Sequence, residues 1–204
     1  MGYYPIAIDI TDRACLIVGG GEIAYRKAKS LRSSGARVTV IAPEVDARFA
    51  GLDGVEVIRR PYAEGDAAGY TLVFAATSDR AVNSAIFSEA NESGTLVNVI
   101  DDPELCSFIA PAVVRRGDLM LAVTSSGRSP MLSKRIRAEL ERLYGPEYEQ
   151  YIEILGGLRD AVKAKYTTQP EREAVFARLL EGGILELIRE GKTQEAKEKA
   201  LQCI

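Results

Sequence analysis

Histidine and tryptophan are both absent from this chain of 204 residues. A chain without histidine lacks the usual general base near neutral pH and the commonest protein metal ligand. Proton transfer then falls to a carboxylate, lysine, tyrosine or cysteine side chain, and we expect no metal site held by the protein. The three cysteines, Cys15, Cys106 and Cys203, are odd in number and far apart. That spacing favours free thiols over disulfides or a zinc site.

The sequence also has no apolar run of transmembrane length and no excess of positive charge. Its first ten residues, MGYYPIAIDI, contain no basic region and no cleavage signal of the secretory type. A net charge of −3 argues against a general nucleic-acid binder. Hydrophobic and charged contents of 47% and 27% are those of an ordinary globular protein. We therefore expect a cytoplasmic protein with one full domain and a smaller one, which binds neither membrane nor nucleic acid.

A glycine turn lies between a short apolar strand at residues 15–18 and a helical pattern that continues to Leu31. The turn, Gly19-Gly20-Gly21-Glu22-Ile23-Ala24, fits the dinucleotide fingerprint G-x-G-x-x-G/A. Gly19 suits the tight turn, Gly21 lets a pyrophosphate approach bare backbone, and Ala24 lets the helix pack closely on the sheet. The alternative is a plain strand–helix turn. The flanking strand and helix favour a nucleotide site.

Further strands are expected at residues 37–41, 55–58, 72–77 and 96–100, with a helix at 79–93. This alternation predicts an α/β fold with a Rossmann-like, doubly wound parallel sheet that has helices on both faces. Ligands of such sheets bind beyond the carboxyl ends of the strands. The residues expected at that edge are Gly19, Gly21, Glu22, Ile23, Pro43, Glu44, Thr77, Asn98 and Asp101. A typical NAD site has an acid at the end of its second strand, whereas this chain has Ile41 there and Glu44 three residues later.

The pattern changes after the fifth strand. Two apolar runs at 107–114 and 119–125, joined by residues 115–118, predict a hairpin. A helix is expected at 130–143, with Ser129 as its N-cap and Pro130 at its first position. From Gly145 onward the pattern is helical throughout. We predict a Rossmann domain at 1–112, a dimerisation region at 113–145 and a helical C-terminal domain at 146–204. The apolar stripes of the hairpin and helices predict a homodimer.

Basic side chains are concentrated between Val113 and Arg137, with Asp118 as the only acid in that segment. They are Arg115, Arg116, Arg128, Lys134, Arg135 and Arg137. A solvated helix face is one interpretation of such a run. The run surrounds the turn Ser125-Ser126-Gly127-Arg128 at the start of a helix, where anions bind readily. We therefore expect Ser125, Ser126, Gly127 and Arg128 to hold a small polyanionic substrate.

Two adjacent carboxylates, Asp101 and Asp102, follow the fifth strand. Asp102 precedes Pro103, which restricts it to extended backbone and suits a turn. Asp101 lies three residues after Asn98, so the turn can direct both side chains to the ligand edge. Because the chain has no histidine, we interpret Asp101 as the candidate acid or base.

The chain as a whole resembles the precorrin-2 dehydrogenase and sirohydrochlorin ferrochelatase family, which also forms the N-terminal module of siroheme synthases. The resemblance rests on CLIVGGGEIAYRKA, on Ala75-Ala76-Thr77, on VNVIDDPELCSFIAPAVVRRGDLMLAVTSSGRSP and on the helical tail. It implies NAD as cofactor, a homodimer, and oxidation of precorrin-2 to sirohydrochlorin. In some members ferrous iron is also inserted as a substrate.

The resemblance also implies roles for particular residues. The family's catalytic aspartate falls on Asp101, and its NAD contacts fall on Glu22, Ile23, Pro43 and Glu44. A serine that is phosphorylated in some relatives falls on Ser125. Two alternatives stay open: a Rossmann module that senses NAD without catalysis, and an enzyme whose main task is iron insertion.

Overall fold

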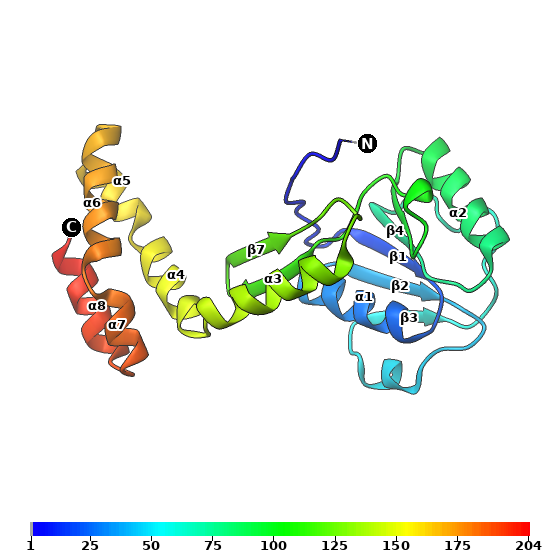
Figure 1. Cartoon of the computed structure of the whole chain (residues 1–204), viewed down its shortest axis with the longest axis horizontal. Helices are drawn as coiled ribbons and strands as arrows, with labels where there is room; N and C mark the ends of the chain where they lie inside the picture. Colours follow the sequence, from blue (N-terminus) through cyan, green and yellow to red (C-terminus); the bar gives the residue numbers. More distant parts are fainter. Residues whose placement is uncertain (1) are drawn as a thin grey trace. The chain divides into compact units, whose positions relative to one another are not determined.

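The computed structural model describes residues 2–204, which form two compact units (Figure 1). The first unit ends at Ala110, and the second runs from Pro111 to Ile204. The three-part division expected from the sequence stays a prediction. Within residues 2–204, no helix has the length and apolar character that crossing a bilayer requires.

The first unit is built on a five-stranded parallel sheet. Its strands are β1 (Ala14–Val18), β2 (Arg37–Ile41), β3 (Val55–Ile58), β4 (Leu72–Ala75) and β5 (Leu96–Val99), in the order β3-β2-β1-β4-β5. The last residue of β1, Val18, pairs with Ile41 on one side and with Ala75 on the other. The strand order therefore reverses between β1 and β4, which makes this the switch point of a doubly wound sheet. The expected Rossmann-like fold is confirmed.

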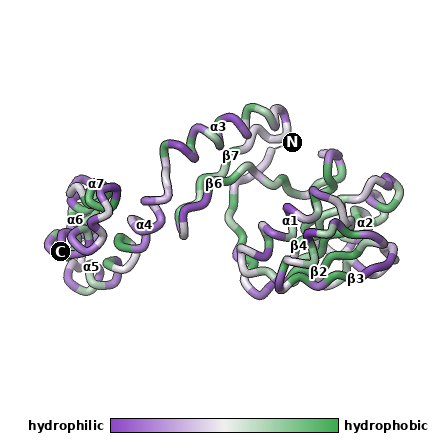
Figure 2. The backbone as a smooth tube through the Cα atoms, turned by 90° about the horizontal axis from the view of Figure 1, so that it is seen from below, coloured by the Kyte–Doolittle hydropathy of each residue, from purple (hydrophilic) through white to green (hydrophobic). Residues whose placement is uncertain are grey.

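Helices cover both faces of this sheet, as expected. Helix α1 (Glu22–Ser33) buries Ala24, Ala28 and Leu31 in the hydrophobic cluster on one face. Helix α2 (Arg80–Glu92) buries Ile86 and Ala90 in the cluster on the other face. The central strands are apolar along their length because both of their faces are buried, and Figure 2 shows them in the hydrophobic colours.

Helices α1 and α2 connect β1 to β2 and β4 to β5, whereas the other connections of the first unit lack an α-helix. A 3₁₀ turn, η1 (Ala47–Gly51), follows β2, and residues 59–71 link β3 to β4 without a helix. A second 3₁₀ turn, η2 (Pro103–Leu105), follows β5. The chain then pairs antiparallel with β5, where the Ser107 N–H donates to the Val97 carbonyl at 2.9 Å and Asn98 bridges to Cys106.

The second unit begins with a two-stranded hairpin, β6 (Ala112–Arg116) and β7 (Leu119–Val123). The hairpin is confirmed, but two of its expected limits are wrong. Residues 106–108 belong beside β5, so the first strand starts at Ala112. Arg115 and Arg116 lie within β6, and the turn is only Gly117 and Asp118. Gly117 has a φ of +54°, which supplies the positive φ that a two-residue hairpin turn requires.

Six helices complete the second unit. They are α3 (Pro130–Leu143), α4 (Glu147–Gly157), α5 (Arg159–Lys165), α6 (Gln169–Glu181), α7 (Ile184–Arg189) and α8 (Thr193–Gln202). Ser129 caps α3 through its hydroxyl, which accepts from the Leu132 N–H, and Pro130 occupies the first turn as expected. Helices α4 to α8 close around their own apolar cluster, which includes Val162, Leu179 and Ile184.

Candidate functional site

A cavity of about 650 Å³ opens at the carboxyl edge of the parallel sheet. Its walls come from the turns after β1, β2, β3 and β4 and from the start of α2. They comprise Val18, Gly19, Gly20, Gly21, Ile41, Ala42, Pro43, Glu44, Pro61, Tyr62, Ala76, Thr77, Ser78, Asp79 and Val82. The cavity therefore lies at the switch point, where doubly wound sheets bind their ligands. Its volume is typical of sites for small molecules and cofactors.

Backbone hydrogen bonds fix the glycine turn between the neighbouring strand ends. The Gly19 N–H donates to the Ile41 carbonyl at 2.9 Å, and the Gly20 carbonyl accepts from the Asp46 N–H at 2.8 Å. Gly19 has a φ of +124°, which residues with a side chain rarely adopt. A Cβ at Gly20 would stand 1.9 Å from the Glu44 carbonyl oxygen. Both positions therefore require glycine for the fold itself.

Gly21 differs from these two glycines because its surroundings are open. A Cβ built there meets no atom within 4 Å, and the φ of Gly21 is −79°. Gly21 is the N-cap of α1 and offers no side-chain cap to the first N–H groups of that helix. Uncapped N–H groups and the positive end of the helix dipole favour an anion at this point. The space and the donors fit the pyrophosphate of a dinucleotide.

The turn after β4 forms the opposite wall of the cavity. The Thr77 hydroxyl donates to Asn83 Oδ1 at 2.8 Å, while the Asn83 amide donates to the Thr77 carbonyl at 3.1 Å. The Asp79 carboxylate caps α2 by accepting from the Ala81 N–H at 2.8 Å. Thr77 therefore lines the cavity with a side chain whose orientation is set by Asn83.

The structure brings most of the sequence-predicted cofactor residues together. Gly19, Gly21, Pro43, Glu44 and Thr77 line the one cavity. Glu22 and Ile23 follow directly as the first residues of α1. Asn98 is the exception: it is buried in β5, and its amide donates to the Phe108 carbonyl at 2.9 Å. Its visible role is to hold the 106–108 segment, and the cofactor contact stays a prediction.

Sequence reasoning missed one wall of the cavity, which is formed by Pro61 and Tyr62. A signal for it was present, because residues that closely follow a parallel strand emerge at the same edge of the sheet. Tyr62 comes four residues after the end of β3.

The two candidate carboxylates differ in their surroundings. Asp102 lies 3.7 Å from the Arg80 guanidinium, and its backbone carbonyl accepts from the Leu105 N–H and the Cys106 thiol. Asp101 is exposed, and within residues 2–204 its carboxylate has no hydrogen-bond or ion-pair partner. Its φ of +62° is rare outside glycine, asparagine and aspartate, and such backbone often occurs at functional sites. The turn therefore leaves Asp101, and not Asp102, available for a ligand.

A serine cluster forms the predicted polyanion turn in the second unit. The Ser125 hydroxyl accepts from the Ser129 N–H at 2.9 Å and from the Ser133 hydroxyl at 3.2 Å. Ser126 and Gly127 both have positive φ values, +53° and +79°. The Ser125 side chain thus shapes the turn, while Arg128 is exposed.

Several of the basic side chains in this region have local partners. Arg116 donates to the carbonyls of Tyr144 and Glu141, and Arg137 pairs with the Glu141 carboxylate at 2.8 Å. Arg135 pairs with Glu139 at 3.2 Å. Arg128 and Lys134 enter no ion pair among the described residues, so they are the positive charges best able to meet a ligand.

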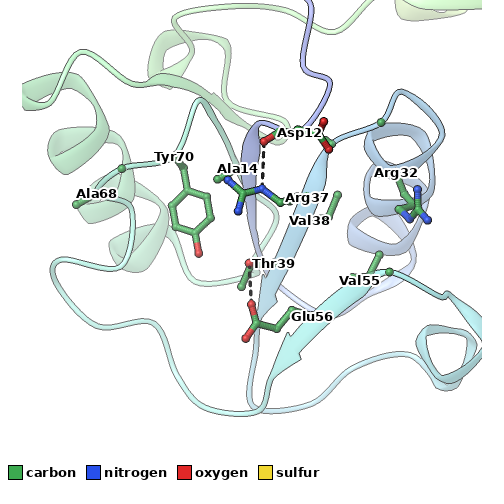
Figure 3. A pocket seen from close by; sticks show the side chains of 14 residues that line it. Asp12, Ala14, Arg32, Arg37, Val38, Thr39, Val55, Glu56, Ala68 and Tyr70 are labelled. Carbon is green, nitrogen blue, oxygen red and sulfur yellow. Dashed lines mark hydrogen bonds between the residues drawn. The ribbon is translucent and has the colours of Figure 1, made fainter.

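A second hollow, of about 850 Å³, lies at the amino edge of the sheet (Figure 3). Arg37, Thr39, Glu56 and Tyr70 line it, and Arg37 Nε donates to the Asp12 carbonyl at 3.0 Å. This edge has neither the glycine turn nor the start of α1. We therefore place the nucleotide in the smaller cavity at the carboxyl edge.

Comparisons with known proteins identify the family of the chain. A family model described as "Putative NAD(P)-binding" matches residues 6–112. Models described as "Sirohaem biosynthesis protein central" and "Sirohaem synthase dimerisation region" match residues 116–143 and 147–204.

Curated relatives include the siroheme synthase of Nitrosomonas eutropha, which is 36% identical over 212 residues. That alignment covers 100% of this chain and 44% of the relative. The siroheme synthase of Stutzerimonas stutzeri is 39% identical over 200 residues, with 97% of this chain and 43% of the relative covered. The chain thus spans less than half the length of these relatives.

A solved structure titled "SirC, precorrin-2 dehydrogenase" superposes with a TM-score of 0.77 at 28% identity. The match covers 98% of this chain and 100% of that chain. The chain therefore belongs to the NAD(P)-binding family of siroheme biosynthesis that includes siroheme synthase and precorrin-2 dehydrogenase.

Proposed function

We propose that this protein oxidises precorrin-2 to sirohydrochlorin with NAD as the oxidant. The observation that carries the proposal is the switch-point cavity, where the open position at Gly21 adjoins the uncapped start of α1. The superposition on a precorrin-2 dehydrogenase, which covers 98% of this chain and 100% of that one, supports the choice of substrate.

The reaction removes two hydrogens from precorrin-2. A bound nicotinamide cofactor would supply the hydride acceptor for one of them. The other leaves as a proton, and Asp101 is the base that takes it, because its carboxylate has no partner within residues 2–204 and follows β5 at the ligand edge. The Gly19–Gly21 turn and the start of α1 bind the pyrophosphate, while Thr77 borders the same cavity.

The cavity favours NAD over NADP. Glu44 and Asp79 line it, and none of its described lining residues is a lysine or arginine. The nearest basic side chain along β2's exit, Arg48, is held by Asp46 at 2.7 Å. A 2′-phosphate on the adenosine half would therefore add negative charge near Glu44, which follows β2, without a free countercharge. We expect a lower KM for NAD than for NADP.

The polyanion turn and the second copy of the chain complete the proposal. Precorrin-2 is rich in carboxylates, and Arg128 and Lys134 supply countercharge near the Ser125 turn.

We propose a homodimer, which is supported by the matched dimerisation model at 147–204 and by apolar side chains that the second unit leaves exposed. The cytoplasmic location stays a prediction.

The decisive experiment is an anaerobic assay of the purified protein with precorrin-2 and NAD. We expect NADH and sirohydrochlorin to appear in equal amounts, each followed by its absorbance. Cofactor binding without any sirohydrochlorin would favour a sensor of NAD over an enzyme. Insertion of iron as a further substrate stays a prediction, so a second arm of the experiment adds ferrous ion to the sirohydrochlorin product. If the sirohydrochlorin absorbance is lost faster with the protein than without it, iron insertion is established.

A further inference from the structure

We propose that Tyr62 holds the adenine base of the dinucleotide and that Glu89 positions the tyrosine ring for this task. The inference rests on the proposed use of NAD. It adds Tyr62 as the residue that determines where the adenosine half of the cofactor binds. It starts from the one wall of the cavity that no glycine or phosphate motif explains.

The segment between β3 and β4 is held in place by two carboxylates. Asp66 accepts from the Arg60 guanidinium through both of its oxygens, one of them at 2.7 Å, and from the Ala63 N–H at 2.8 Å. Glu89, on α2, accepts from the N–H groups of Gly65 and Ala67 at 3.0 and 2.9 Å. A segment without helix or strand thereby acquires a fixed path.

Glu89 also accepts a short hydrogen bond from the Tyr62 hydroxyl. Burial, together with this bond to the carboxylate, raises the pKa of Tyr62, so the phenol keeps its proton for donation. Because the hydroxyl is tied to α2, the ring is fixed at one end, and Tyr62 both lines the cavity and packs against the apolar cluster on the α2 face of the sheet. The ring is a pre-positioned flat apolar surface, which a purine can stack on.

The location of this wall selects the adenine half. In a sheet of this order the pyrophosphate lies at the turn after β1, and the adenosine half extends over the neighbouring strands of the first half, β2 and β3. Pro61 and Tyr62 follow β3, and Ile41 and Pro43 end or follow β2. These residues give this part of the cavity an apolar lining, whereas the acid proposed for catalysis follows β5 on the other side of the switch point.

Binding of cofactor fragments tests the assignment. ADP-ribose carries the adenine base, and nicotinamide mononucleotide does not. Stacking of a base on an aromatic side chain contributes about 1–3 kcal/mol, so Tyr62→Ala should weaken ADP-ribose binding by roughly 5- to 150-fold. Calorimetry measures this change, and ligand-observed NMR should find binding of nicotinamide mononucleotide unchanged.

Further variants separate stacking from folding. Tyr62→Phe keeps the ring and should bind ADP-ribose more tightly than Tyr62→Leu, which keeps only apolar bulk. Glu89→Gln has one acceptor oxygen in place of two and should weaken ADP-ribose, but not nicotinamide mononucleotide. Tyr70→Ala is the matched control, because Tyr70 ends the same segment but lines the hollow at the opposite edge.

Wild-type affinity for ADP-ribose in Tyr62→Ala, or in both Tyr62→Leu and Glu89→Gln, would overturn the inference. An equal loss for both fragments would also overturn it, since that result marks a general collapse of the cavity. The proposed function fails separately, if the wild-type protein binds neither NAD nor ADP-ribose. Thermal melting of each variant identifies any that does not fold, in which case the remaining variants decide.

Discussion

The parallel sheet of the first unit and the hairpin of the second unit are both rich in apolar residues, but the sheet buries them and the hairpin leaves several of them exposed. All four residues of β4 are buried, as are four of the five in β1. In β6 and β7 only Val114 is buried, and Val113 and Met120 are left 37% and 42% exposed. Two strands cannot form an independent core. The sheet is thus complete within one chain, whereas the hairpin requires a covering surface.

A similar contrast divides the second unit. Helices α4 to α8 enclose Val162, Leu179 and Ile184 completely. Helix α3 leaves Met131 and Leu132 77% and 51% exposed. Adjacent exposed apolar side chains of this kind mark interaction surfaces. The proposed cofactor cavity therefore lies in the self-sufficient unit, and we propose that association uses the unit with uncovered apolar side chains.

The largest expected effect concerns chemistry in the first unit. Asp101→Asn keeps the size of the side chain and tolerates the φ of +62°, but it cannot accept a proton. Because a general base contributes about 10²–10⁴-fold, turnover of precorrin-2 should fall by that order. The NAD affinity and the melting temperature of Asp101→Asn should stay unchanged. Asp102→Asn should keep the turnover, NAD affinity and melting temperature of the wild type. A near wild-type rate in Asp101→Asn would mean that Asp101 does not act as the base.

The glycine turn gives the next largest effect, and it separates binding from folding. Gly21→Val places a side chain where no atom lies within 4 Å, so the protein should fold. The same side chain blocks the start of α1, and losing two charged hydrogen bonds there should weaken NAD roughly 100-fold. Gly20→Ala is the contrasting variant, because its Cβ meets the Glu44 backbone and should lower the melting temperature. Unchanged NAD affinity in Gly21→Val, measured by calorimetry, would contradict the assignment.

Dimerisation tests the second unit directly. We expect light scattering at micromolar concentration to give twice the mass of one chain. The double variant Met131→Glu and Leu132→Glu should raise the dimer dissociation constant roughly 10- to 100-fold, since buried interface side chains commonly contribute 1–3 kcal/mol. Leu180→Glu, on α6 and 62% exposed, tests the segment that the dimerisation model matches. Ile6→Glu, at a 68% exposed position of the first unit, is the control and should leave the dissociation constant unchanged. Dissociation by Leu180→Glu alone would move the interface to residues 147–204, and a monomeric wild type would refute the homodimer.

Arg128→Ala should have a smaller effect. Arg128 is exposed, and exposed charge pairs contribute about 0.2–1 kcal/mol, so the KM for precorrin-2 should rise about two- to fivefold. The KM for NAD should not change. Arg135→Ala serves as the control because Arg135 already pairs with Glu139. If Arg128→Ala raises both KM values equally, Arg128 has a structural role and does not bind substrate.

The sequence predicted the strands of the sheet and the glycine turn because these are local signals. Short apolar runs and the glycines that flank them indicate strands and turns without information from distant residues. The switch point then follows from the strand order. The role of Asn98 was not accessible in this way. Its partner, the Phe108 carbonyl, lies in a segment that was expected to join the hairpin, and pairing of residues 106–108 with β5 depends on tertiary contacts. The place of Tyr62 at the carboxyl edge could have been predicted because it closely follows β3, but its orientation could not, because Glu89 fixes it from 27 residues away.

The smallest expected effect concerns Lys27, a half-buried cation of the self-sufficient unit. Its ammonium lies 5.0 Å from the centroid of the Phe74 ring, and within residues 2–204 no carboxylate pairs with it. Burial, and secondarily the charge of Arg26, lowers the pKa of Lys27. The unfolded chain therefore binds more protons between this lowered value and the usual pKa near 10.5, so stability from this residue rises with pH through that window.

Lys27→Met removes this titration but keeps an unbranched side chain of similar length. As pH increases toward 10.5, the melting temperature of the wild type should therefore rise relative to that of Lys27→Met. The reason is that the cost of burying the ammonium disappears when it loses its proton. Part of that cost is offset by the Phe74 ring, which contributes about 0.5–1 kcal/mol while the amine is charged. Lys29→Met, at an exposed position on the same helix, should differ from the wild type by a nearly constant amount across the range. A constant difference for Lys27→Met as well would show that the amine is solvated, and the first unit would then contain no unpaired buried charge at this position.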